Sequence, residues 1–304
     1  MNKWKIVVIV LIALGIISYL LSFLVNDFST EKIGNKIAII PIYGAITLNE
    51  NSNFFDISGT STNNIIDALK KAEEDPSIKG IILEINSPGG TVVASEEIAN
   101  AVKKAKKPVV SWIREEGASG AYWIASSSKY VVADPFSITG SIGVIGSYLE
   151  FSDLMKKYGI SYEQLTSGEY KDTGSPFKKL NDKEKELLQS KINKIHDYFV
   201  DEIAKNRNME KEKVKEIANG AFYLGIEAKE LGLVDELGSK DEAVNKAKEL
   251  ADIKDAYLVT YRRKASFFDL FSNSIAYGSF YVGKGISYGL NEQLNNNNFD
   301  FKAI

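Results

Sequence analysis

The sequence has no cysteine and a single histidine, His196, among its 304 residues. The absence of cysteine excludes disulfide bonds, thiolate zinc sites and thiol catalysis together. The scarcity of histidine matters for hydrolases, because imidazole is the general base that most of them use to activate a nucleophile. A hydrolase built on this chain is therefore expected to use another base, and a buried lysine is the main candidate.

The chain also lacks a strong charge of either sign. It carries 37 basic and 40 acidic residues, well mixed, for a net charge of −3. This balance gives no electrostatic footprint for nucleic acid, so that class of partner is excluded. The carboxylates have no metal-ligand spacing and the sequence has no phosphate-binding loop. No metal and no other cofactor is expected.

One long apolar run stands at the N-terminus, where Ile6–Val25 is twenty residues without a charge. A helix of that length spans roughly 30 Å, the hydrocarbon thickness of a bilayer. Lys3 and Lys5 precede the run, and the first charge after it is Asp27. The positive-inside rule predicts a single-pass anchor in the cell membrane, with a short cytoplasmic N-terminus and an extracytoplasmic remainder. A cleaved signal peptide is the competing interpretation, but its apolar region usually has only about 7–15 residues.

After the anchor, short apolar runs alternate with segments of helical periodicity. The expected strands are 36–43, 80–85, 108–113, 130–133 and 138–145, and the expected helices are 61–72, 91–106, 151–158 and 181–205, with another opening near Ser119. The strand at 36–43 is near-continuously apolar, as in sheets buried on both faces. The alternation predicts an α/β layer fold with crossover helices.

These elements divide the chain into four parts. They are a cytoplasmic stub with the transmembrane anchor (1–27), a polar linker (28–35), one α/β domain (36–260) and a C-terminal tail (261–304). The tail is rich in aromatic residues and then in asparagine. It is expected to pack on the core or on another subunit, with a contact to the membrane surface as the alternative.

Ser119 lies in the run Gly-Ala-Ser-Gly-Ala, residues 117–121, between a predicted strand and a predicted helix. A serine at a helix start exposes its hydroxyl and has free backbone N–H groups beside it. Gly120 would let a substrate carbonyl approach the main chain closely. Most serines in such runs are only helix caps, and a nucleophile elbow would have glycine where Ala121 stands. Ser119 is thus a candidate nucleophile that needs further support.

Asn-Ser-Pro-Gly-Gly at 86–90 follows one predicted strand and precedes a helix. It is either a tight turn or part of an oxyanion hole, in which the N–H groups of Gly90 and Gly120 donate to developing negative charge. Bare backbone at the carboxyl end of a strand favours the second interpretation, because open α/β sheets usually bind ligands there.

Lys171 lies in a segment flanked by glycines, 168–174. Most lysines are solvated, and a lysine acts as a base only when burial keeps it neutral. A hydroxyl would orient the amine, and Ser141 in the run Thr-Gly-Ser-Ile-Gly is the candidate. His196 is the rival base, but its position predicts a flank of the packed stripe on the long helix.

Together these motifs resemble those of the signal peptide peptidase A family, the membrane-anchored Ser-Lys peptidases of bacteria and archaea. The resemblance extends from about Ile37 to about Asp252 and rests on order and spacing, with Ser119 and Lys171 lying 52 residues apart. The motifs that carry it are 86–90, 118–120, 139–141, 170–176, 220–225 and 228–238.

The resemblance implies a crotonase/Clp-protease-like α/β fold, with a mostly parallel sheet core and surrounding helices, preceded by one transmembrane helix. It also implies five site residues, which are the nucleophile Ser119, the general base Lys171, the lysine-positioning hydroxyl Ser141, and the oxyanion-hole donors Gly90 and Gly120. The serine of this family is often followed by two glycines. Here the second is Ala121, which is expected to add a methyl near the nucleophile.

The implied activity is that of a serine endopeptidase, with 36–260 as the peptidase domain, that cleaves remnant signal peptides or other hydrophobic segments by acyl transfer. A homo-oligomer is expected, because members of this family form rings or domes in which the lysine can come from a neighbouring subunit. One alternative is a related Ser-Lys protease that clips the termini of membrane proteins. Another is a non-catalytic crotonase-like assembly that binds peptides or scaffolds a membrane complex. A third alternative, a crotonase that acts on coenzyme A thioesters, is supported by the implied fold only.

Overall fold

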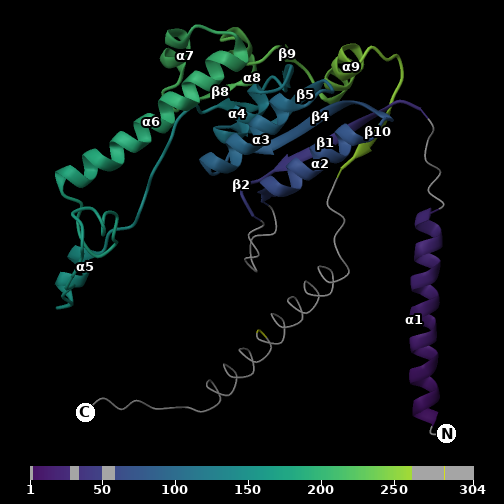
Figure 1. The fold of residues 1–304 in the computed structure, drawn as a ribbon, viewed down its shortest axis with the longest axis horizontal. Helices are drawn as coiled ribbons and strands as arrows, with labels where there is room; N and C mark the ends of the chain where they lie inside the picture. The colour runs from purple at the N-terminus through teal and green to yellow at the C-terminus, as the bar shows by residue number, and fades with distance from the viewer. Residues whose placement is uncertain (1–2, 28–33, 50–58, 262–283, 285–304) are drawn as a thin grey trace, which may run out of the picture.

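The structure is a computed structural model that describes residues 3–27, 34–49, 59–261 and 284 (Figure 1). In this part of the chain the strands are β1 (Lys36–Tyr43), β2 (Ile46–Thr47), β3 (Thr60–Ser61), β4 (Ile78–Ser87), β5 (Val109–Ala118), β6 (Tyr130–Ala133), β7 (Ile138–Gly140), β8 (Phe222–Leu224), β9 (Glu236–Leu237) and β10 (Tyr257–Thr260). The helices are α1 (Lys3–Asp27), α2 (Thr62–Glu74), α3 (Val92–Lys104), α4 (Gly120–Ser126), α5 (Ser152–Lys157), α6 (Asp182–Arg207), α7 (Lys211–Ile217), α8 (Gly225–Glu230) and α9 (Lys240–Leu250).

An eight-stranded sheet forms the body of the protein, with the strand order β10-β1-β4-β5-β6-β9. β7 pairs with the end of β5, and β8 pairs with β7. All pairs along this order are parallel, and β7 is parallel to β5 and antiparallel to β8. The mostly parallel α/β architecture predicted from the sequence is confirmed. The parallel pairing places the carboxyl ends of β4 and β5 side by side, where ligands bind in open α/β sheets.

Both faces of the sheet are buried, as the continuous apolar run at 36–43 predicts. Ile40 and Ile42 of β1 belong to one core cluster, together with residues of α2, α3, α4 and α6. Ile37 and Ile39 belong to the other, with Ala243 and Ala247 of α9. Helices therefore cover the sheet from both sides, and α4 and α6 lie on the same side.

The strand predicted at 138–145 is shorter than expected. β7 ends at Gly140, where two successive residues, Gly140 and Ser141, have φ of 73° and 49°, outside the strand region. The predicted helix at 181–205 is confirmed by α6, which begins with a capping box between Asn181 and Glu184.

The N-terminal segment predicted as an anchor forms α1. Within the described ranges, no helix combines the length and the apolar composition needed to cross a membrane. The predicted transmembrane helix is therefore not confirmed. Most of the linker 28–35, and the tail beyond Tyr261 apart from residue 284, lie outside the described residues.

Between β7 and α6 the chain leaves the sheet in a segment, residues 145–181, that we call the arm. α5 and the loops around it lie at the N-terminal end of α6, away from the strands (Figure 1). The arm exposes large apolar side chains, including Leu149 at 73% and Leu165 at 100%. An apolar surface of this kind is characteristic of a segment that contacts another molecule.

Candidate active site

Ser119 alone forms the turn between β5 and α4. Its backbone has φ 52° and ψ −124°, a conformation that costs about 1–3 kcal/mol for a residue other than glycine. Two hydrogen bonds hold it: the Ser119 N–H donates to Gly140 O at 2.8 Å, and the Trp123 N–H donates to Ser119 O at 3.0 Å. The strained strand-to-helix turn of a nucleophile elbow is thus present without its usual glycine two residues after the serine.

Ser119 lines a cavity of about 610 Å³. Ser141, Gly90 and Gly120 line it too, so the structure brings together four of the five predicted site residues. α6 contributes one part of the lining, formed by Gln189, Ile192, Asn193, Ile195, His196 and Phe199. From the sequence His196 is the rival base and is expected on the flank of the packed stripe, and the structure places it in the lining of the same cavity as Ser119.

The backbone N–H groups of Gly90 and Gly120 are suited to hold negative charge. Neither donates to an acceptor among the residues that the structure describes. The two glycines are close neighbours, because a Cβ added to Gly120 would lie 3.3 Å from Gly90 N. Two unused donors beside a serine can stabilise the oxyanion of an acyl-transfer intermediate.

Packing requires both positions to be glycine. A Cβ on Gly90 would lie 1.9 Å from the carbonyl oxygen of Ile46, and one on Gly120 would lie 2.2 Å from Ser95 Oγ. Ser95 is a buried residue of α3 whose hydroxyl donates to Thr91 O at 3.0 Å. The sequence predicted a role in substrate approach for Gly120, and the structure adds a contact that no local pattern could indicate.

Gly120→Ala is expected to lower the free energy of unfolding by about 1–3 kcal/mol through overpacking against Ser95. Urea denaturation measures this loss. The double variant Gly120→Ala/Ser95→Ala removes the hydroxyl but leaves a contact of 3.0 Å to Ser95 Cβ, so it should regain only part of the stability. Ser95→Ala alone is the matched control, and strict additivity of the two changes would contradict the contact.

The prediction that Ala121 adds bulk near the nucleophile is wrong. Ala121 is fully buried and belongs to the core cluster under α4. It does not line the cavity. Successive residues of a helix are rotated by about 100°, so the residue after Gly120 points to a different side of α4.

Ser141 is held by a loop that precedes β8. Its N–H donates to Ala221 O at 2.9 Å, and its hydroxyl lies 3.4 Å from Gly220 O. The hydroxyl contact is long for an O–H···O hydrogen bond and therefore weak. Ser141 lines the cavity, and its hydroxyl has capacity left for another polar group.

Lys171 does not line the cavity in the single chain. It is exposed in a turn of the arm, where its N–H donates to Gly168 O at 3.2 Å. The next residues are tied to the first turn of α6, because Glu184 accepts from Thr173 Oγ1 at 3.3 Å and Lys178 Nζ at 2.7 Å. Glu184 precedes His196 by twelve residues, or about 18 Å along the helix. One copy of the chain does not bring Lys171 to Ser119.

Glu184 fixes the arm to α6 through a buried carboxylate that is only 1% exposed. The hydrogen bond from Lys178 and that from the Asn181 N–H hold the pKa of this carboxyl below its usual value. The ionised form that these donors require is therefore favoured at neutral pH.

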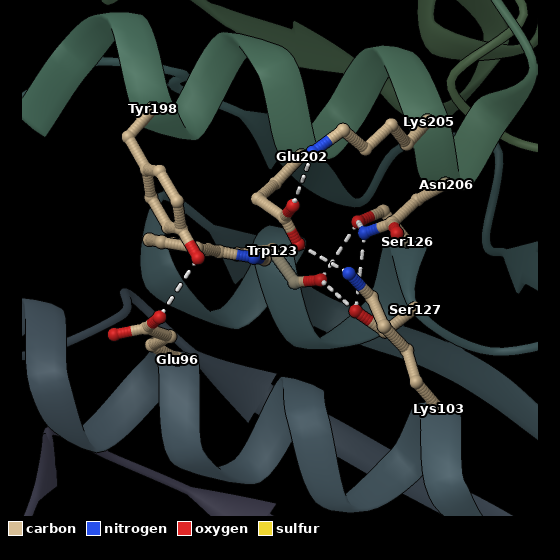
Figure 2. A network of polar contacts seen from close by, with 9 residues as sticks. All are labelled: Glu96, Lys103, Trp123, Ser126, Ser127, Tyr198, Glu202, Lys205 and Asn206. Carbon is tan, nitrogen blue, oxygen red and sulfur yellow. Dashed lines mark hydrogen bonds and ion pairs between the residues drawn. The ribbon is translucent and has the colours of Figure 1, made fainter.

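The C-terminal half of α6 is fixed to α3 and α4 by a polar network around Trp123 (Figure 2). Tyr198 donates to Glu96 Oε1 at 2.9 Å, and this hydrogen bond together with burial raises the pKa of Tyr198 to about 12. The carboxylate of Glu202 forms ion pairs with one lysine of α3 and one lysine of α6. The ring of Phe199 stacks on Trp123 with centroids 4.8 Å apart. These contacts fix α6, which lines one side of the cavity, to α3 and α4.

The fold and the site define a Clp-protease-like α/β protein with a serine at a strained turn beside two free N–H donors. The family model for Clp protease matches residues 48–134, and the model for peptidase family S49 matches residues 101–254. The chain belongs to peptidase family S49. This confirms the family predicted from the motifs, which are similar to those of signal peptide peptidase A.

Relatives cover most of the chain. It is 37% identical over 302 residues to "Putative protease MJ0651" of Methanocaldococcus jannaschii, with 95% of each chain covered. It is also 37% identical over 251 residues to "Putative signal peptide peptidase SppA" of Enterococcus faecium, covering 80% of this chain and 73% of that one. "Protease 4" of Haemophilus influenzae matches 73% of this chain at 37% identity, but only 36% of its own length.

Proposed function

We propose that this protein is a membrane-anchored serine endopeptidase that cleaves hydrophobic peptide segments, remnant signal peptides among them. The observation that carries the proposal is the geometry at Ser119, a strained serine in a cavity with the free N–H groups of Gly90 and Gly120. The relative named as a signal peptide peptidase supports the substrate class. The uncharged run Ile6–Val25 supports the anchor, with the peptidase domain on the extracytoplasmic side.

The reaction proceeds by acyl transfer without a cofactor. Ser119 Oγ attacks the scissile carbonyl carbon while the neutral amine of Lys171 takes the hydroxyl proton. The N–H groups of Gly90 and Gly120 stabilise the oxyanion. The lysine then passes the proton to the leaving amine as the peptide bond breaks. A water gives a proton to the same lysine and attacks the acyl carbon, and the lysine returns that proton to Ser119 Oγ as the ester bond breaks.

The lysine of this dyad comes from a second copy of the chain. The arm that carries Lys171 exposes apolar side chains and is held at the N-terminal end of α6, while the cavity of the same copy is not lined by Lys171. Docking of the arm on a neighbouring copy buries that surface and completes the site in a ring or dome. Ser141, whose hydroxyl has capacity to spare, orients the incoming amine.

The cavity lining supports an apolar substrate. Much of it is contributed by aliphatic and aromatic side chains, namely Val92, Trp123, Val144, Ile145, Ile192, Ile195 and Phe199. Burial of apolar side chains of a substrate here is favourable by about 25 cal/mol per Å². A charged side chain in the same place would lose its hydration without a partner.

The full chain in detergent or in lipid vesicles should therefore cleave an apolar peptide in preference to a polar one. For a Leu-rich peptide and its variant with alternate leucines replaced by aspartate, we expect kcat/KM to differ by about tenfold or more. Mass spectrometry of the products gives the cleaved bond. Equal rates would contradict the substrate class, and no cleavage of either peptide would favour the scaffold alternative.

A further inference from the structure

His196 connects the α6 wall of the cavity to the loop that supports Ser141. Its Nε2 lies 2.8 Å from the carbonyl oxygen of Ala218. A carbonyl oxygen only accepts hydrogen bonds, so Nε2 carries the hydrogen and donates. Within the described ranges, this is the one side-chain hydrogen bond from α6 to the loop 218–221.

The loop 218–221 is paired with the segment that follows β7. Ala221 O accepts from the Ser141 N–H at 2.9 Å, and the Gly220 N–H donates to Ile142 O at 3.1 Å. The Ala218 N–H donates to Val214 O at 2.9 Å, which joins the loop to the end of α7. A displacement of Ala218 is therefore transmitted to Ser141.

The same segment also holds the nucleophile. Gly140, the residue before Ser141, accepts from the Ser119 N–H at 2.8 Å. Ser119 and Ser141 both have positive φ, 52° and 49°. Such conformations persist only where the surrounding contacts over-determine them, so each tether of the loop affects the geometry of both serines.

We infer that His196 is a positioning residue of the proposed peptidase reaction, which acts through the loop 218–221 on Ser141 and on the Ser119 turn. This rests on the proposed function. His196 is not assigned as the general base, because within the described ranges its ring forms no hydrogen bond to Ser119 and its Nε2 donates to the Ala218 carbonyl. His196 lines the cavity and holds the loop 218–221 through its hydrogen bond to that loop. The helix that carries it, α6, is fixed by the ring contact with Trp123 and by the network in Figure 2.

Two amide variants of the full chain separate this role from a general effect on stability. In His196→Gln the side-chain nitrogen lies about as far from the backbone as Nε2, so it can still donate to Ala218 O. In His196→Asn the nitrogen reaches only about as far as Nδ1, so the hydrogen bond is lost. On an apolar peptide we expect kcat within about threefold of the parent for Gln, and about tenfold or more below it for Asn. KM should change less than about threefold in both variants.

Hydrogen exchange at the amides of Ser141 and Gly220, which donate across the contact between the two segments, supplies a readout that does not depend on cleavage. Exchange at these amides should be faster in the Asn variant by about tenfold or more, and close to that of the parent in the Gln variant. Equal behaviour of the two variants, or a change in KM alone, would overturn the positioning role. If the parent cleaves no peptide while the exchange rates still separate, the proposed function fails and the tether of Ser141 by His196 stands.

Discussion

Ser119→Ala is expected to lower kcat/KM for an apolar peptide by about 10⁴-fold or more, because no acyl-enzyme can form without the hydroxyl. The remaining rate would come from the oxyanion-hole donors and from substrate binding. The fold should be unaffected, since the Ser119 hydroxyl has no hydrogen-bond partner within the described ranges. The free energy of unfolding of the Ser119→Ala variant should stay within about 0.5 kcal/mol of that of the parent.

The matched control for this change is Ser190→Ala. Ser190 is an exposed residue of α6 whose hydroxyl donates to Leu187 O at 2.7 Å, and it does not line the cavity. Its replacement should leave kcat/KM within about twofold of the parent. Cleavage that persists in Ser119→Ala, with the same products, would show that the nucleophile lies elsewhere.

Lys171→Met should lower kcat/KM by about 10³-fold or more, because the serine then has no base to take its proton. Methionine keeps most of the length of the side chain and removes only the amine. The effect should fall on kcat more than on KM, since the amine acts on the reacting atoms. Single-turnover measurements should show that both formation and hydrolysis of the acyl-enzyme slow, because the lysine takes the proton in each step.

Lys183→Met is the control from the neighbouring part of the chain. Lys183 pairs with Glu169 of the arm at 3.0 Å, and both side chains are largely exposed. Such a pair contributes about 0–1 kcal/mol, so its loss should leave both stability and cleavage nearly unchanged. If Lys171→Met retained more than about a tenth of the parent activity, the Ser-Lys mechanism would be wrong.

The sequence predicts the elements whose signals are local. The apolar run that forms β1 is buried on both faces as expected, and α6 begins directly after its capping residue Asn181. The strand-to-helix turn at Ser119 also follows from adjacent residues, although the missing glycine at 121 argued against an elbow. The strained backbone of Ser119 is held by Gly140 of β7, whose carbonyl oxygen accepts a hydrogen bond from the Ser119 N–H.

The features that the sequence does not predict depend on long-range contacts. Ser95 requires glycine at 120 only because α3 packs against α4. His196 reaches the cavity because α6 crosses α4 at Trp123, which no periodicity indicates. The spacing of Ser119 and Lys171 suggested a pair, but the chain between them leaves the sheet and is tied to the far end of α6.

Mixing the two inactive variants, Ser119→Ala and Lys171→Ala, tests most directly whether Ser119 of one copy works with Lys171 of another. With the variants coexpressed in equal amounts and mixed oligomers isolated by two affinity tags, the account predicts recovery of about a quarter of the parental rate. A quarter is the fraction of neighbouring pairs that combine an intact serine and an intact lysine in the required order after random assembly, and removal of unmixed oligomers raises it in small rings. Mixed oligomers that remain as inactive as either variant alone would contradict it.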